Sequence, residues 1–320
     1  MSSDFSSIEL FSSALLFTGV WQKNPDNSVS AYWNYASAEF RTDSSKIIVT
    51  YKDTPDAFIE IDGKEKQYSV QNNEVIIETD GKLHSIRIVG RYDLPITLVS
   101  VKVLSSAKVL PPEKRPYIHF IGDSITHFCS SFSFNTPKLL GADYSVVAQA
   151  GMSLHDGWGY YKMPEGILIR RGMETMYHKL EFPTKTAELT EYNFEICRVP
   201  DVIVIFLGTN DYLDCETHEK MGNIRIFAES YKNFVGMLKE RFPDAKIYML
   251  NALSDKYCRA RGIEEAHKTI SVRFPDVQLV RSNEWGVEIS DDGTHPSKNG
   301  YVTLTENLAA LLKNDLKELF

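Results

Sequence analysis

The hydrophobic pattern of the chain changes once, near residue 115, and this change restricts the possible folds more than any other feature. Before it, short apolar runs alternate with turn residues, and almost no stretch has helical periodicity. After it, apolar runs alternate with stretches whose apolar residues recur at helical spacing. The first pattern is typical of antiparallel sheets packed as a sandwich, and the second of a parallel sheet flanked by helices. The sequence therefore predicts two domains, residues 1–112 and 117–320, joined by a proline-rich polar segment.

The first domain is expected to be all-β. Strands are predicted at residues 46–51, 57–61, 74–79, 85–89 and 96–103. The dipeptides Asp62-Gly63 and Asp80-Gly81 stand between such runs, and they predict tight hairpin turns because glycine adopts positive φ at little cost.

The second domain is expected to be of the α/β class. Strands are predicted at residues 117–121, 144–147, 202–207, 246–250 and 277–280. Apolar residues at helical spacing predict one helix from Phe227 to Phe242 and a final one from Tyr301 to Leu316, started by Pro296 and Ser297. Residues 151–199 match neither pattern, so we expect long loops there.

Charge and composition restrict the partners of the chain. The formal net charge is -8 and the pI about 5.6, so no broad positive field favours nucleic acid or an anionic membrane. No apolar run approaches the roughly 18 residues of a membrane-spanning helix. The apolar stretch 10–20 lacks the preceding basic residues of a signal peptide, so a cytoplasmic location is expected.

The cysteines indicate no metal site and no disulfide framework, because they are widely spaced and form no CxxC or Cys/His cluster. We expect buried thiols at Cys129, Cys197, Cys215 and Cys258. No metal and no organic cofactor is predicted.

A serine stands where an open α/β sheet binds its ligands. The predicted strand 117–121 leads directly into Gly122-Asp123-Ser124, which places Ser124 at the carboxyl end of a parallel strand. A helix starting there would direct amide N–H groups at charge that develops near the hydroxyl. The alternative is an ordinary turn in which Asp or Ser caps a helix. Ser124 is therefore a candidate nucleophile.

A serine hydroxyl needs a base, and Asp292-Gly293-Thr294-His295 provides a candidate. A neutral imidazole can accept the hydroxyl proton while a carboxylate holds the other ring nitrogen as a donor. Asp292 is preferred over Asp291 because the three-residue spacing to His295 lets the carboxylate fold back onto the ring. The alternative is a surface loop that ends at a helix start.

Two further elements follow predicted strands. In Gly208-Thr209-Asn210-Asp211, the Asn210 amide can donate a hydrogen bond to a tetrahedral oxyanion. Gly151, after the strand near 144–147, can offer its backbone N–H. Simple turn or capping roles remain the alternatives for both elements. The order Ser, Gly, Asn, Asp/His at successive strand ends favours one common site.

These four elements resemble the motif blocks of SGNH/GDSL hydrolases over essentially all of residues 117–320. The resemblance implies a flavodoxin-like three-layer fold and an ester-cleaving serine mechanism. It also implies a catalytic triad of Ser124, His295 and Asp292, with an oxyanion hole formed by Ser124, Gly151 and Asn210. The sequence lacks G-x-S-x-G around Ser124, so the nucleophile elbow of ordinary α/β-hydrolases is absent.

With its β-rich first domain, read as a jelly-roll-like sandwich, the chain resembles carbohydrate esterase family two. This resemblance implies hydrolysis of short-chain, above all acetyl, esters on carbohydrates, with a small-molecule or oligosaccharide ester as substrate. A lipase-like or lysophospholipase-like hydrolase and a catalytically inactive carbohydrate-binding protein are the alternatives.

The sequence leaves the oligomeric state open. The aromatic stretch Trp158, Tyr160 and Tyr161 either stacks on a sugar ring or anchors its loop to the core.

Overall fold

The chain folds into two compact units. A computed structural model describes residues 4–91, 95–128, 131–159, 171–180, 190–194, 196, 198–212, 220–254 and 259–320. The first unit is Met1–Lys114 with Tyr192–Arg198, and the second is Arg115–Glu191 with Val199–Phe320. Residues 192–198 thus depart from the predicted division into 1–112 and 117–320, because Ile196 forms a β-bridge with the fully buried Trp21.

The first unit contains two antiparallel sheets of six strands. One sheet has the order β3-β4-β11-β6-β9 with β1 also paired to β11, and the other has the order β12-β5-β10-β7-β8 with β2 also paired to β5. The strands are β1 (Phe5–Ile8), β2 (Leu16–Thr18), β3 (Gln22–Lys23), β4 (Val29–Ala31), β5 (Ser37–Thr42), β6 (Lys46–Tyr51), β7 (Ala57–Ile61), β8 (Lys64–Lys66), β9 (Glu74–Glu78), β10 (His84–Gly90), β11 (Ile96–Leu104) and β12 (Val109–Leu110).

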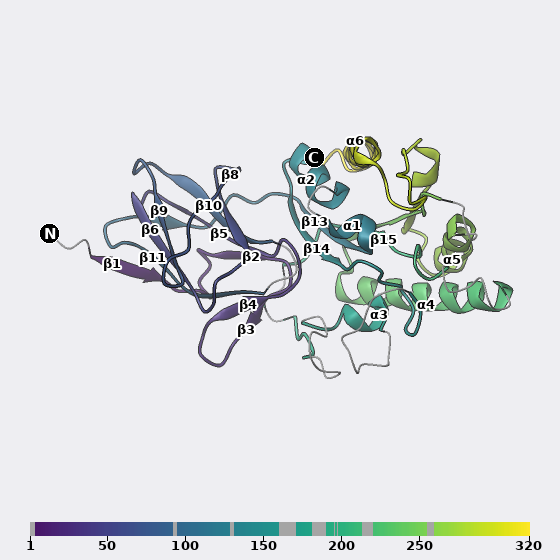
Figure 1. The fold of residues 1–320 in the computed structure, drawn as a ribbon, viewed down its shortest axis with the longest axis horizontal. Coiled ribbons are helices and arrows are strands. Elements are labelled where there is room, and N and C mark those ends of the chain that lie inside the picture. Colours follow the sequence, from purple (N-terminus) through teal and green to yellow (C-terminus); the bar gives the residue numbers. More distant parts are fainter. Residues whose placement is uncertain are drawn as a thin grey trace. The chain divides into compact units, whose positions relative to one another are not determined.

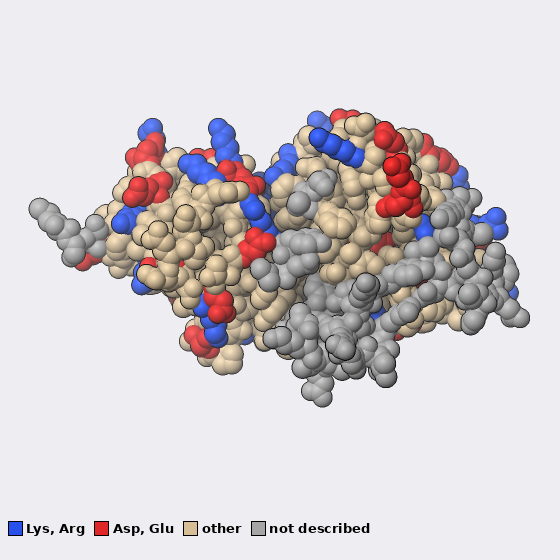
Figure 2. Space-filling model, viewed as in Figure 1, with Lys and Arg blue, Asp and Glu red and all other residues tan. Residues whose placement is uncertain are grey.

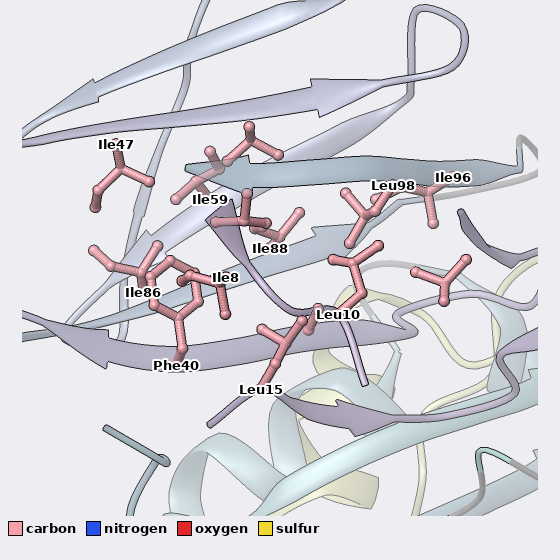
Figure 3. Close-up of a cluster of buried hydrophobic side chains, with 14 of the residues drawn as sticks. Ile8, Leu10, Leu15, Phe40, Ile47, Ile59, Ile86, Ile88, Ile96 and Leu98 are labelled. Carbon is pink, nitrogen blue, oxygen red and sulfur yellow. The ribbon is translucent and has the colours of Figure 1, made fainter. Parts of the chain in front are cut away.

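Side chains from both sheets form one buried apolar cluster. Figure 3 shows Ile47 and Leu98 from one sheet in the same cluster as Phe40, Ile86 and Ile88 from the other. Burying this apolar area is the main force that holds the first unit together.

The predicted hairpin at Asp62-Gly63 is confirmed. It joins the antiparallel pair β7 and β8, and both residues have positive φ, 52° and 73°, as a type I′ turn requires. The prediction at Asp80-Gly81 is wrong. β9 and β10 belong to different sheets, so this dipeptide lies in a connection between sheets.

The second unit contains a five-stranded parallel sheet, as predicted, with the order β14-β13-β15-β16-β17. The strands are β13 (Tyr117–Gly122), β14 (Asp143–Ala148), β15 (Val202–Phe206), β16 (Lys246–Leu250) and β17 (Gln278–Val280). β13, β14 and β15 are buried along their whole length, and β15 is accordingly apolar throughout, whereas β14 also carries the buried polar residues Asp143 and Ser145.

Helices lie on both sides of this sheet (Figure 1). α2 packs against α6, and α4 packs against α5. The helices are α1 (Ser124–His127), α2 (Phe132–Leu140), α3 (Met173–Met176), α4 (Lys220–Arg241), α5 (Arg259–Arg273) and α6 (Lys298–Asp315), with a 3-10 turn η3 (Ser282–Glu284). The two predicted helices correspond to α4 and α6, and Ser297 caps α6 by accepting the N–H of Gly300.

The strand order determines where a ligand can bind. β14 lies on one side of β13, and β15 lies on the other. Sheets of this kind bind ligands at the carboxyl ends of the strands, where the chain order reverses. Ser124 follows β13 and Asn210 follows β15, so both lie at the expected position.

The described surface mixes charges of both signs. On the face drawn in Figure 2, basic and acidic side chains are interspersed rather than gathered by sign. Among the described residues, no helix combines the length and apolarity needed to span a bilayer, and no group of three or more His, Cys, Asp or Glu is placed to hold a metal ion. The four cysteines, with Tyr160 and Tyr161, lie outside the described residues.

Candidate active site

Ser124 is the first residue of α1, and only Asp123 separates it from the end of β13. The helix is capped by Asp123, whose Oδ1 accepts the N–H of Ile125 at 3.0 Å, so the Ser124 hydroxyl is not used as a cap. Gly122 permits this sharp turn, because a Cβ there would lie 2.0 Å from Thr126 Oγ1 and 3.0 Å from the Phe206 carbonyl oxygen. The local sequence thus leaves the hydroxyl available for chemistry.

The structure brings Ser124 and His295 together across 171 positions of sequence. Ser124 Oγ lies 2.7 Å from His295 Nε2, and His295 Nδ1 lies 2.6 Å from Asp292 Oδ2. These contacts favour the tautomer in which Nδ1–H donates to Asp292 and Nε2 accepts the serine proton. Among the described residues, Asp291 makes no hydrogen bond to the ring, so Asp292 is the carboxylate that contacts His295 Nδ1.

The loop that carries His295 is itself fixed by Asp292. Its Oδ1 accepts the N–H of Thr294 at 2.8 Å and that of His295 at 2.9 Å. Burial raises the pKa of the Asp292 carboxyl, but the hydrogen bonds from His295 and Thr294 outweigh burial and hold the pKa below its ordinary value. Asp292 is therefore ionised at neutral pH and can stabilise an imidazolium.

We expect Asp292→Asn to lower kcat for p-nitrophenyl acetate by about a hundred- to ten-thousandfold, which is less than loss of the nucleophile. The asparagine oxygen can still accept the loop N–H groups, but its NH₂ would face His295 Nδ1 and favour the wrong tautomer. Steady-state kinetics of Asp292→Asn beside Asp291→Asn measure this. Equal losses in both variants would show that the orienting role is misassigned.

Two backbone N–H groups and one side-chain amide come from residues that line the same pocket, namely Ser124, Gly151 and Asn210. Gly151 follows β14 with φ of 76°, a conformation that favours glycine. No hydrogen bond joins the backbone N–H of Ser124 or of Gly151 to another described residue. Asn210 Nδ2 donates one hydrogen to the Met152 carbonyl at 2.9 Å, which orients the amide and leaves its second hydrogen available. The three donors suit an oxyanion.

These groups face an open pocket of about 560 Å³. It is lined by Ser124, Phe128, Ala150, Gly151, Asn210, Asp292, Thr294 and His295. All five residues predicted for the site thus line one pocket. The sequence did not single out Phe128, which follows Ser124 by four residues, or Ala150 and Thr294, which directly precede Gly151 and His295.

Two buried carboxyls lie behind the pocket. Burial raises the pKa of Asp123 to about 6, although the hydrogen bond from the Ile125 N–H opposes this. Burial also raises the pKa of Asp211 to about 7, against the backbone hydrogen bonds from His155 and Leu154. The sequence showed both residues within motifs, but a short motif does not reveal complete burial.

Two other histidines near Ser124 in sequence are structural. His119 Nδ1 lies 2.7 Å from Ser145 Oγ, and His119 Nε2 lies 3.2 Å from the Tyr177 hydroxyl. Burial lowers the pKa of His119 to about 3, so its ring is neutral. His127 is fully buried in α1.

His155 belongs to a second Ser-His-Glu cluster. Its Nδ1 lies 2.8 Å from Ser230 Oγ and 2.9 Å from Glu174 Oε1. A serine triad needs the hydroxyl and the carboxylate on opposite ring nitrogens. Because both oxygens here contact the same nitrogen, this cluster cannot relay a proton to a serine.

The aromatic stretch is described only at Trp158. Its ring packs edge-on against His155, with centroids 4.8 Å apart, and its carbonyl accepts the Ser153 hydroxyl at 2.8 Å. The adjacent Gly159 packs closely on the same loop, since a Cβ there would lie 2.8 Å from the Gly151 carbonyl oxygen. Both contacts of Trp158 lie within its own loop, and the residue is partly exposed.

Comparison with known proteins gives one curated relative and many structural ones. No protein-family model matches the chain. It is 27% identical over 249 residues to the cellulase/esterase CelE of Acetivibrio thermocellus, a match that covers 68% of this chain. The chain spans only 27% of the length of that relative.

Solved structures of similar fold cover nearly the whole chain. A family two carbohydrate esterase from Cellvibrio japonicus has a TM-score of 0.74 at 17% identity and covers 99% of both chains. The acetyl xylan esterase Est2A of Butyrivibrio proteoclasticus has a TM-score of 0.75 at 16% identity, with 98% of both chains covered. A family two carbohydrate esterase from Clostridium thermocellum, in complex with cellohexaose, has a TM-score of 0.71 at 22% identity and covers 95% of this chain and 99% of that one. The resemblance to carbohydrate esterase family two is thus confirmed in the fold.

Proposed function

We propose that the chain is a serine esterase that removes short acyl groups, above all acetyl, from carbohydrates. The observation that carries the proposal is the 2.7 Å contact of Ser124 Oγ with His295 Nε2, inside a pocket that also presents oxyanion donors. The proposed substrate is a small-molecule or oligosaccharide ester. The curated relative, named a cellulase/esterase, and the similar esterases support this class of substrate.

The mechanism follows from the geometry. His295 Nε2 accepts the proton of Ser124 as Oγ attacks the acyl carbonyl, while Asp292 stabilises the imidazolium that forms. The carbonyl oxygen becomes an oxyanion, stabilised by the N–H groups of Ser124 and Gly151 and by the Asn210 amide. The sugar hydroxyl leaves with the proton from His295. Water then attacks the acyl-enzyme and gives one proton to His295. His295 passes this proton to Ser124 Oγ as the acyl–oxygen bond breaks, which releases the free acid and restores the serine hydroxyl.

The finer fold assignments belong to the same proposal. The strand order β14-β13-β15-β16-β17 is that of flavodoxin-like sheets, which supports a flavodoxin-like three-layer domain. The two antiparallel sheets around one buried cluster support a jelly-roll-like sandwich in the first unit. A cytoplasmic location stays a prediction.

A series of p-nitrophenyl esters tests the acyl specificity. We expect kcat/KM to fall by about tenfold or more between acetate and hexanoate, because the pocket is open and the added methylenes of a longer chain would stay largely in solvent. Acetate release from acetylated xylo-oligosaccharides should also be lost in Ser124→Ala. A kcat/KM that rises with chain length would contradict the proposal and favour a lipase-like enzyme. Binding of oligosaccharides without any ester turnover would favour a carbohydrate-binding protein.

A further inference from the structure

Asp211 is a buried carboxylate that the proposed mechanism does not use. It follows Asn210 directly and has no exposed surface. A buried carboxylate is unfavourable unless its oxygens accept hydrogen bonds. Asp211 Oδ1 accepts the N–H of Leu154 and that of His155, both at 3.0 Å, and Oδ2 also meets the Leu154 N–H at 2.9 Å.

These N–H groups belong to the loop that begins with the oxyanion donor Gly151. The Asn210 amide holds the Met152 carbonyl of the same loop at 2.9 Å. Residues 210 and 211 therefore bind the loop at 152, 154 and 155, immediately after Gly151. The Asp211 carboxylate and the Asn210 amide thus both hold this loop in place by hydrogen bonds.

The sheet alone does not set the distance between the two donor segments. Gly151 follows β14 and Asn210 follows β15, and these strands are not neighbours, because β13 lies between them. No ladder hydrogen bond joins β14 to β15. The hydrogen bonds from residues 210 and 211 are thus the direct connection between the two loops in the described residues.

We infer that Asp211 is a positioning residue, which fixes the Gly151 N–H and the Asn210 amide relative to each other so that both reach one oxyanion. The inference rests on the proposed esterase function. Asp211 acts only through the loop, and Ser124 and His295 keep their contact without it. Its loss should therefore weaken binding of the transition state more than binding of the substrate.

Asp211→Asn tests this with little change in volume. The asparagine has one oxygen, and its NH₂ would meet the Leu154 N–H, so the loop loses part of its attachment. We expect kcat for p-nitrophenyl acetate to fall by about ten- to a hundredfold, with KM changed by less than about threefold. Each rate is divided by the number of competent sites, titrated to completion with a fluorophosphonate, so that partial unfolding does not count as lost catalysis.

Asp201→Asn is the matched control. Asp201 Oδ2 accepts the Tyr117 N–H at 2.8 Å. This hydrogen bond is of the same kind, but it lies at the amino ends of β13 and β15, whereas Ser124 and Asn210 follow their carboxyl ends. Asp201→Asn should leave kcat per titrated site unchanged. If Asp211→Asn also keeps kcat per site within about twofold of wild type, the inference is wrong.

A double-mutant cycle with Asn210→Ala shows whether Asp211 acts through the oxyanion donors. The two losses should combine to less than their product, because both variants disturb the same hole. Full multiplicativity would overturn the positioning role.

Hydrogen exchange gives a readout that needs no turnover: the Leu154 and His155 amides should be protected in wild type and exchange faster in Asp211→Asn. Unprotected amides in wild type would refute the attachment itself, whereas a wild type inactive on every ester would refute only the proposed function.

Discussion

Ser124→Ala should lower kcat for p-nitrophenyl acetate by about a millionfold, to the background of the assay. The substitution removes the only hydroxyl that lies 2.7 Å from His295 Nε2 in the described site. It leaves the fold intact, because α1 is capped by Asp123 and not by Ser124. Initial rates at saturating ester, together with a thermal melt, measure both expectations.

A second serine serves as the control for this variant. Ser271 lies on α5, and its hydroxyl donates to the Lys268 carbonyl at 3.2 Å. Ser271→Ala should turn over the ester like wild type. Turnover by Ser124→Ala at more than about a hundredth of the wild-type rate would exclude this serine as the nucleophile.

His295→Ala should cause a loss of the same order as Ser124→Ala, about a millionfold, because the two residues act as one unit. The His295 side chain is 35% exposed, so its removal opens a space that solvent can reach. Added imidazole should therefore restore part of the rate in His295→Ala and none in Ser124→Ala. Rates measured against imidazole concentration give the comparison.

His267→Ala is the control for loss of a histidine as such. Its ring contacts the Val277 carbonyl at 3.3 Å, on α5 and away from the pocket lining. This variant should keep wild-type kcat. If His295→Ala retained substantial activity without imidazole, another group would have to be the base.

Apolar strands of five or more residues could be predicted from the sequence, whereas the short apolar β2 and the more polar β5 could not. β6, β7 and β16 begin and end at the predicted residues. β5 was missed although it is central in its sheet, because Ala38 and Glu39 are poor strand formers and the buried Glu39 is stabilised by a hydrogen bond from Ser85. That partner becomes visible only once the strands are paired.

The sequence analysis missed α2 and α5, and only α2 has a local sequence that opposes a helix. α2 carries Pro137 in its interior, and proline normally ends or kinks a helix. The helix α2 is instead stabilised by packing against α6, which lies near the C-terminal end of the sequence. Local propensity contains no information about such a contact.

The residues of the candidate site could be predicted because each stands at a strand end or in the last loop. The spacing of Asp292 and His295 indicated their pairing, and the structure shows the hydrogen bond. The attachment of the 151–155 loop to Asp211 could not be predicted, since it joins two segments that follow non-adjacent strands. Motif order identifies which residues meet, whereas burial and hydrogen bonding between loops determine how they are held.

The central claim is that Ser124 is an activated nucleophile, and its covalent modification tests this most directly. After reaction with a fluorophosphonate, peptide mass spectrometry should find the adduct on Ser124, formed rapidly in wild type and far more slowly in His295→Ala. Ester turnover that continues while Ser124 stays unmodified, or an adduct on another side chain, would contradict the claim.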